Sequence, residues 1–265
     1  MEARGTRIGL GIWAALVVLF LYFPIVLIVL YAFNKSNVQS WPIPGFTVRW
    51  WSAAFHNEEM RRALELSLKA AGLATTIALL LGSAAAFAVA RYRFFGRETV
   101  SFLLVLPLAL PGIITGMALN SFFAFWSWSL TLWTIVIGHA TFCIVVVYNN
   151  VIARLRRSSP SLTEASMDLG ADGWQTFRFV TLPVISTALV SGALLAFALS
   201  FDEVIVTTFT AGAQNTLPLW IFGNIRLGQE LPQVNVVVAI VIALTVVPVY
   251  LAHRLSRETG ILRRQ

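Results

Sequence analysis

Residues 164–183 read Glu-Ala-Ser-Met-Asp-Leu-Gly-Ala-Asp-Gly-Trp-Gln-Thr-Phe-Arg-Phe-Val-Thr-Leu-Pro. It begins with a glutamate, has a glycine near its centre and ends in Leu-Pro, and long apolar segments flank it on both sides. A polar loop in that place, with this much local patterning, indicates a surface offered to a partner outside the membrane.

The composition predicts an all-α polytopic membrane protein. Hydrophobic residues make up 58% of the chain and charged residues only 12%, whereas a soluble domain has about 25% charged residues. The net charge of +7 does not indicate nucleic acid, because the arginines gather at the ends of the apolar stretches. Cys143 is the only cysteine and lies in an apolar stretch, which excludes disulfides and cysteine metal clusters. We expect no metal, cofactor or catalytic residue.

Six stretches are long enough to cross about 30 Å of hydrocarbon and predict six transmembrane helices. They lie near residues 9–31, 66–90, 100–126, 131–152, 184–209 and 234–252. An N-terminus inside gives the inner segments most of the Lys and Arg, so both termini and the 164–183 loop are expected in the cytosol. The first stretch is too long and continuous for a cleaved signal peptide.

This pattern divides the chain into three parts. Residues 1–60 form the first transmembrane helix and an outer loop, and residues 61–252 form a transmembrane core. The core includes a cytosolic loop, 158–183, and residues 253–265 form a basic cytosolic tail. Within the core, Pro107 and Pro111 predict a bend in the third span.

The cytosolic loop has the signals of two short helices. Ser161 and Glu164 have the spacing of a capping box before a helix at about 162–169, and Gly170 suits a left-handed residue at its end. Asp172 and Gln175 can cap a second helix that ends near residue 180. A helix this short is unstable alone and becomes useful when a partner clasps it. The alternative interpretation is a solvated connecting loop.

The loop resembles the "EAA" loop of ATP-binding-cassette (ABC) importer permeases of type I, which have the MetI-like fold. Glu164, Ala165, Ser166, Gly170 and Val180 through Pro183 fall at the intervals of that motif, with Ser166 and Val180 as small departures. The resemblance implies a coupling helix that docks on a dimer of ABC ATPase subunits. It assigns the coupling to Glu164, Ala165, Ser166, Asp168, Gly170, Leu182 and Pro183. The chain has no Gly-x-x-x-x-Gly-Lys-Ser/Thr phosphate loop, so a partner would hydrolyse ATP.

Asp202 and Glu203 are adjacent carboxylates within the predicted fifth span. Ionisable groups at membrane depth are costly and usually face a cavity, so this pair is a candidate for a cation pathway. Asp202 lies about 28 Å beyond Pro183 at about 1.5 Å per residue, toward the outer face, and we favour it over Glu203. The alternative is a structural carboxylate paired with Arg226 or with a helix N-terminus.

The resemblance narrows to the spermidine/putrescine permeases, and to the second, C-type subunit of such systems. The similar segments are Tyr31–Ser36, Gly45–Trp51, Ser200–Glu203 and Thr216–Asn235. This resemblance implies uptake of a polyamine across a bacterial cell (inner) membrane. It also implies an extracytoplasmic binding protein and a second, related permease as partners. Seven tryptophans, Trp220 among them, fall toward the outer face; they predict an interfacial belt, or cation–π contacts along the substrate pathway.

Three alternatives remain open. The same permease could import ferric iron or an amino acid derivative. A cation-coupled secondary transporter could use Asp202 as its titrating group, but that would leave the loop unexplained. A haem-bearing membrane anchor would need paired axial ligands, and His139 is the only histidine within the predicted spans. We expect His139 to hydrogen-bond to a neighbouring helix.

Overall fold

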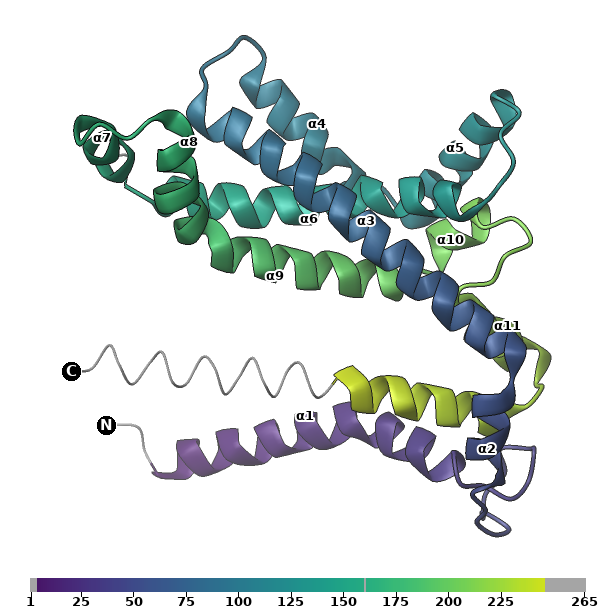
Figure 1. Cartoon of the computed structure of the whole chain (residues 1–265). Coiled ribbons are helices and arrows are strands. Elements are labelled where there is room, and N and C mark those ends of the chain that lie inside the picture. Colours follow the sequence, from purple (N-terminus) through teal and green to yellow (C-terminus); the bar gives the residue numbers. More distant parts are fainter. Residues whose placement is uncertain (1–3, 160, 246–265) are drawn as a thin grey trace. The chain divides into compact units, whose positions relative to one another are not determined.

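The computed structural model describes residues 4–159 and 161–245, and regular structure in this part of the chain is helical. Beyond residue 245, the end of the predicted sixth span and the predicted tail 253–265 lie outside the described residues. The elements in order are α1 (Arg4–Tyr31), α2 (Arg49–His56), α3 (Glu58–Arg91), α4 (Arg97–Ala109), α5 (Gly112–Phe125), α6 (Leu132–Arg157), α7 (Ser161–Asp168), α8 (Gly173–Thr176), the π-helical turn η1 (Phe177–Thr181), α9 (Leu182–Phe201), α10 (Ile205–Thr210) and α11 (Leu217–Leu227). A further helix follows at Leu231–Thr245 (Figure 1).

The chain forms two compact units. The first unit combines Met1–Met60 with Ile221–Gln265, and the second unit is Arg61–Trp220. All residues expected to act in coupling or in the substrate pathway belong to the second unit.

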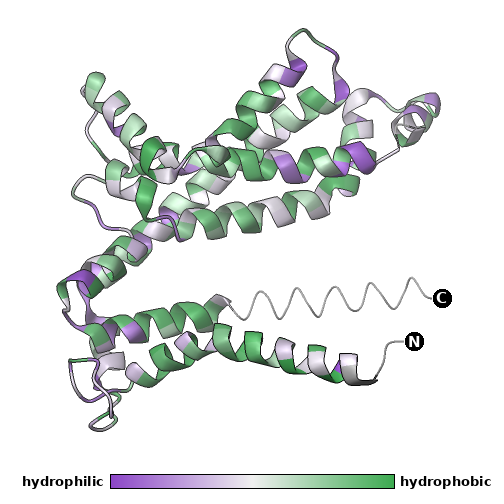
Figure 2. Cartoon of the chain, turned by 180° about the vertical axis from the view of Figure 1, so that it is seen from behind, coloured by the Kyte–Doolittle hydropathy of each residue, from purple (hydrophilic) through white to green (hydrophobic). Residues whose placement is uncertain are grey.

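Among the described residues, four helices are long and apolar enough to cross a membrane: Thr6–Tyr31, Glu58–Arg91, Leu132–Arg157 and Gly173–Phe201. They match the first, second, fourth and fifth predicted spans. Figure 2 shows these helices as hydrophobic over most of their length. The helix Leu231–Thr245 covers the first part of the predicted sixth span and is apolar but shorter.

The third predicted span is broken. α4 and α5 meet at an angle of 104°, with Leu110 and Pro111 at the break. Pro111 has no N–H to donate and is the N-cap residue of α5, which begins at Gly112. The predicted bend is confirmed, and the two halves form a broken span or a re-entrant loop.

The fifth predicted span also ends early. α9 stops at Phe201, and the chain resumes as the short helix α10 at Ile205, so a continuous helix over 184–209 is wrong. The interruption falls on Asp202 and Glu203, which lie between α9 and α10.

The core of the second unit lies where α6 packs against α9 and α4. Tyr148, Val147 and Ile185 are buried there, and Figure 1 shows α6 and α9 side by side. The Tyr148 hydroxyl meets the Ser101 hydroxyl of α4 at 2.6 Å. Helix α6 is therefore the central element against which the functional segments are placed.

In the first unit, the segment after α1 is organised by one buried amide. The Asn34 side chain donates to the Val38 carbonyl at 3.0 Å and accepts from the Ser36 amide at 3.1 Å. The Trp50 indole donates to the Asn34 carbonyl at 2.8 Å, and the Arg49 guanidinium lies over the Trp50 ring. These contacts give the similar segments Tyr31–Ser36 and Gly45–Trp51 a structural role.

Candidate functional site: the coupling segment and the acidic break

We call residues 158–183 the coupling segment. Its first helix, α7, begins at Ser161 and ends in a Schellman motif. The Ala171 amide donates to the Ser166 carbonyl at 3.1 Å, and the Gly170 amide donates to the Met167 carbonyl at 2.8 Å. Gly170 has φ +88, the left-handed conformation predicted from the sequence.

The start of α7 differs from the prediction. The Ser161 amide donates to the Ser159 hydroxyl at 3.3 Å, and the two serine hydroxyls lie 2.6 Å apart. We predicted that the Ser161 amide donates to the Glu164 carboxylate, but it donates to the Ser159 hydroxyl. Glu164 is instead exposed.

The second helix follows the prediction more closely. The Asp172 carboxylate accepts from the Gln175 amide at 2.8 Å, and the Gln175 side chain accepts from the Asp172 amide at 2.9 Å. This capping box starts α8. The Ser166 and Thr176 hydroxyls, 3.1 Å apart, join α7 to α8.

A π-helical turn, η1, joins α8 to α9. The Leu182 amide donates to the Phe177 carbonyl, five residues back, in place of the usual four. Pro183 explains the wider turn, because a proline ring clashes with the carbonyl four residues before it in a regular α-helix. The Leu-Pro exit of the motif thus sets the geometry with which the segment enters the membrane helix.

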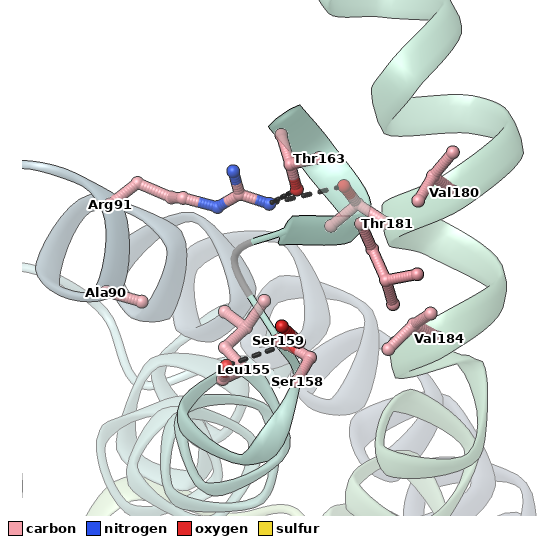
Figure 3. A pocket seen from close by; sticks show the side chains of 10 residues that line it. Ala90, Arg91, Leu155, Ser158, Ser159, Thr163, Val180, Thr181 and Val184 are labelled. Carbon is pink, nitrogen blue, oxygen red and sulfur yellow. Dashed lines mark hydrogen bonds between the residues drawn. The ribbon is translucent and has the colours of Figure 1, made fainter. Parts of the chain in front are cut away.

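Arg91, at the end of α3, connects the two halves of the coupling segment. One guanidinium nitrogen donates to the Thr163 hydroxyl of α7 at 3.0 Å and to the Thr181 hydroxyl of η1 at 3.4 Å. These groups line a cavity of about 270 Å³, and Figure 3 shows Arg91 reaching across it. The Phe87 ring of α3 packs edge-on against Phe177 of η1. Sequence reasoning missed Arg91, since neither periodicity nor a motif links it to two distant threonines.

Several large side chains of the segment are exposed in the part of the chain that the structure describes. Leu169 is 90% exposed, Phe179 70% and Trp174 67%, and the acidic pair Glu164 and Asp168 is also exposed. Ala165 is exposed as well, and Ser166 is half-buried. Exposed large apolar groups beside carboxylates are typical of a protein-docking surface. Leu182 and Pro183 are the first residues of α9.

Asp202 and Glu203 form what we call the acidic break, between α9 and α10. Asp202 caps the C-terminus of α9 and is exposed. The Glu203 carboxylate accepts from the Val206 amide at 2.9 Å, at the N-terminus of α10. Glu203 is therefore the structural carboxylate at a helix N-terminus that the alternative interpretation described. The Asp202 side chain is exposed and can meet a ligand.

Two further predicted residues are placed clearly. Trp220 lies on α11 and is only 4% exposed, so it offers almost no surface to a substrate in this conformation. His139 is buried on α6 and hydrogen-bonds to Ser200 of α9 and Thr207 of α10, which confirms the expected contact with neighbouring helices. The described residues contain no cluster of three or more metal-ligating side chains.

Comparison with known proteins decides the family. A family described as "Binding-protein-dependent transport system inner membrane component" matches residues 78–259. The chain belongs to this family. It is a multi-pass membrane permease component of an ABC importer, and the type I fold predicted from the loop is confirmed.

Curated relatives extend the match over most of the chain. The putrescine transport system permease protein PotI of Escherichia coli (strain K12) is 36% identical over 84% of this chain and 82% of its own length. The spermidine/putrescine transport system permease protein PotC of Haemophilus influenzae is 34% identical over 91% of this chain and 93% of its own.

A solved structure shares the fold. A chain of a bacterial ABC transporter involved in the import of the acidic polysaccharide alginate superposes with a TM-score of 0.70. The match covers 97% of this chain and 98% of that one at 16% identity. This likeness concerns the fold alone.

Proposed function

We propose that this chain is one of two related permease subunits of an ATP-driven importer of polyamines. Its substrates would be spermidine and putrescine, delivered by an extracytoplasmic binding protein. The observation that carries the proposal is the identity of 34–36% to permeases named for these substrates, across more than 80% of each chain. The exposed Asp202 supports it, because a carboxylate attracts a polycation and repels an anion.

The coupling segment supplies the mechanical link in this proposal. A dimer of ABC ATPase subunits holds α7 through the exposed side chains of Glu164 and Asp168 and of Leu169, which follows the helix. When ATP binding and hydrolysis move that dimer, α7 moves with it. The motion passes to η1 and α9 through three sets of contacts: the Schellman motif at the end of α7, the Ser166–Thr176 contact, and the hydrogen bonds from Arg91 to Thr163 and Thr181. The chain itself transmits force and hydrolyses no ATP.

The proposed orientation in the membrane rests on the distribution of the arginines, which are more frequent in the predicted inner segments. The coupling segment and both termini lie in the cytosol, and the acidic break lies toward the outer face. A cation released by the binding protein then meets Asp202 early in its passage. Glu203 shapes the break by capping α10.

The test is uptake of radiolabelled spermidine and putrescine by cells that lack this chain and by cells with the gene restored. We expect uptake to be lost and then rescued by the wild type. Asp202→Asn should reduce it about tenfold or more, which corresponds to about 1.4 kcal/mol of lost interaction. Glu230→Gln is the matched control, because Glu230 is an exposed carboxylate of the first unit, and it should transport normally.

Unchanged polyamine uptake in the deletion strain, with no redundant transporter, would contradict the substrate and leave the permease assignment. A relative with a different named substrate then gives the next test. The putative 2-aminoethylphosphonate transport system permease protein PhnV of Salmonella paratyphi A is 30% identical over 96% of both chains.

A further inference from the structure

The acidic break is held by a continuous series of buried hydrogen bonds centred on His139. The His139 Nδ1 atom lies 2.7 Å from the Ser200 hydroxyl, and Nε2 lies 2.8 Å from the Thr207 hydroxyl. Thr207 in turn donates to the Glu203 carbonyl at 2.6 Å. One side chain of α6 therefore contacts the last turn of α9 and the first turns of α10, on the two sides of Asp202 and Glu203.

The direction of each hydrogen bond follows from this arrangement. The single hydroxyl proton of Thr207 goes to the Glu203 carbonyl, so Thr207 must accept from His139 Nε2–H. A neutral imidazole then has Nδ1 as its acceptor, and Ser200 donates to it. The side-chain polar atoms of His139, Ser200 and Thr207 thus all have partners, and the three residues are buried.

The short helix α10 depends on such contacts at both of its ends. It has six residues, too few to be stable by itself. At its C-terminal end, the Asn120 amide of α5 donates to the Phe209 carbonyl at 2.7 Å, and the Thr134 hydroxyl of α6 lies 2.8 Å from the Thr210 carbonyl and 2.7 Å from the Thr131 carbonyl, with one proton for the two. At its N-terminal end, the contacts are those of Glu203 and His139.

We propose that His139 is a positioning residue that sets the conformation of the acidic break and so the presentation of Asp202. Both ring nitrogens are engaged within the chain, which leaves none for a ligand. The expected effect of His139 on transport rests on the proposed role of Asp202 in polyamine passage. The expected effect of His139 on the conformation of the acidic break is independent of that role.

A thiol-labelling experiment tests the conformation without any substrate. Cys143→Ser removes the single cysteine, and serine can keep the Cys143 donation to the Ala196 carbonyl. Asp202→Cys then reports on the break, and Ser129→Cys, on the exposed segment before α6, is the control. The labelling rate of each introduced thiol is measured in the whole transporter in lipid nanodiscs.

We expect His139→Leu to change the labelling rate at position 202 at least threefold and to leave the rate at position 129 unchanged. Thr207→Val should have the same effect, because it removes the hydroxyl that receives Nε2–H. His139→Gln should restore the rate to within twofold, since the glutamine amide can replace Nε2 as donor. Equal rates at position 202 with and without His139→Leu, or equal changes at positions 202 and 129, would overturn the proposal.

Uptake kinetics test the consequence for transport. When Asp202 is unchanged, His139→Leu should raise the KM for spermidine more than it lowers the maximal rate of uptake. His139→Gln should return the KM toward the wild-type value. In the Asp202→Asn background, His139→Leu should add little, because the group that it positions is absent. Independent, additive effects would contradict positioning through Asp202. Unchanged uptake in Asp202→Asn alone would contradict the substrate role and leave the labelling result standing.

Discussion

At the scale of single residues, Gly82 governs how closely α3 approaches α6. A Cβ atom on Gly82 would lie 2.8 Å from the Ile144 carbonyl oxygen and 3.1 Å from the Tyr148 nitrogen. Both contacts are to backbone, which cannot swing aside as a flexible side chain can. Small residues that let backbones approach are typical of helix contacts in membranes.

We predict that Gly82→Ala destabilises the second unit by about 1–3 kcal/mol, the range for overpacking a tight contact. Gly72→Ala is the matched control on the same helix, because a Cβ there would meet nothing within 4 Å. The measurement is the apparent melting midpoint of the purified transporter in detergent. A Gly82→Ala midpoint equal to that of Gly72→Ala would contradict the close approach of the two backbones.

At the scale of elements, the coupling segment has little apolar core of its own. Of its described residues, Thr163, Thr176 and Thr181 are buried, and Thr163 and Thr181 receive hydrogen bonds from Arg91. Its order therefore depends on a few polar contacts to α3 and within the segment. Elements of that kind occupy the low-stability end of a protein and open locally.

Arg91→Gln should loosen the coupling segment. Removing hydrogen bonds from an exposed guanidinium changes local stability by about 0.5–1 kcal/mol, which predicts about two- to fivefold faster amide exchange in α7 and η1. Arg93→Gln is the control, because Arg93 is exposed and does not line the Arg91 cavity. Hydrogen exchange by mass spectrometry measures both. Equal amide exchange rates in the two variants would show that the Arg91 hydrogen bonds do not order the coupling segment.

Local signals in the sequence predicted the parts of the coupling segment that depend on neighbouring residues. Gly170 and the Asp172–Gln175 box are confirmed because a left-handed end and a capping box act within a few positions. The π-helical turn was not predicted, although Pro183, which explains it, was recognised. Pro183 affects the carbonyl four residues before it, and no residue type at that position indicates a π-helical turn.

Contacts between distant segments account for what the sequence did not predict. The run of apolar residues on both sides of Asp202 predicts one continuous span, whereas α9 ends at Phe201 and the separate helix α10 packs against α5 and α6. His139 was expected to bond to a neighbouring helix, but its partners Ser200 and Thr207 could not be named. Pro107 and Pro111 predict a bend in the third span, but the sequence does not give its angle of 104°.

At the scale of the whole molecule, the proposed function requires the chain to transmit motion between two distant places. The chain belongs to a family of importer permeases, its coupling segment exposes apolar and acidic side chains, and its acidic break lies in the same compact unit as that segment. Helix α9 joins the two places directly, from the Leu-Pro exit at its start to Asp202 at its end. Motion imposed at α7 would therefore reach the break through one continuous helix.

The most direct test of this account is the number of spermidine molecules imported per ATP hydrolysed in proteoliposomes that contain the complete transporter. Gly170 has φ +88, so Gly170→Val strains the end of α7, whereas Gly170→Asn, which tolerates this conformation, is the matched control. We predict that Gly170→Val lowers the ratio at least tenfold while the complex stays assembled, and that Gly170→Asn leaves it within about twofold of wild type. An unchanged ratio in Gly170→Val would contradict the assignment of residues 158–183 as the element that couples ATP hydrolysis to transport.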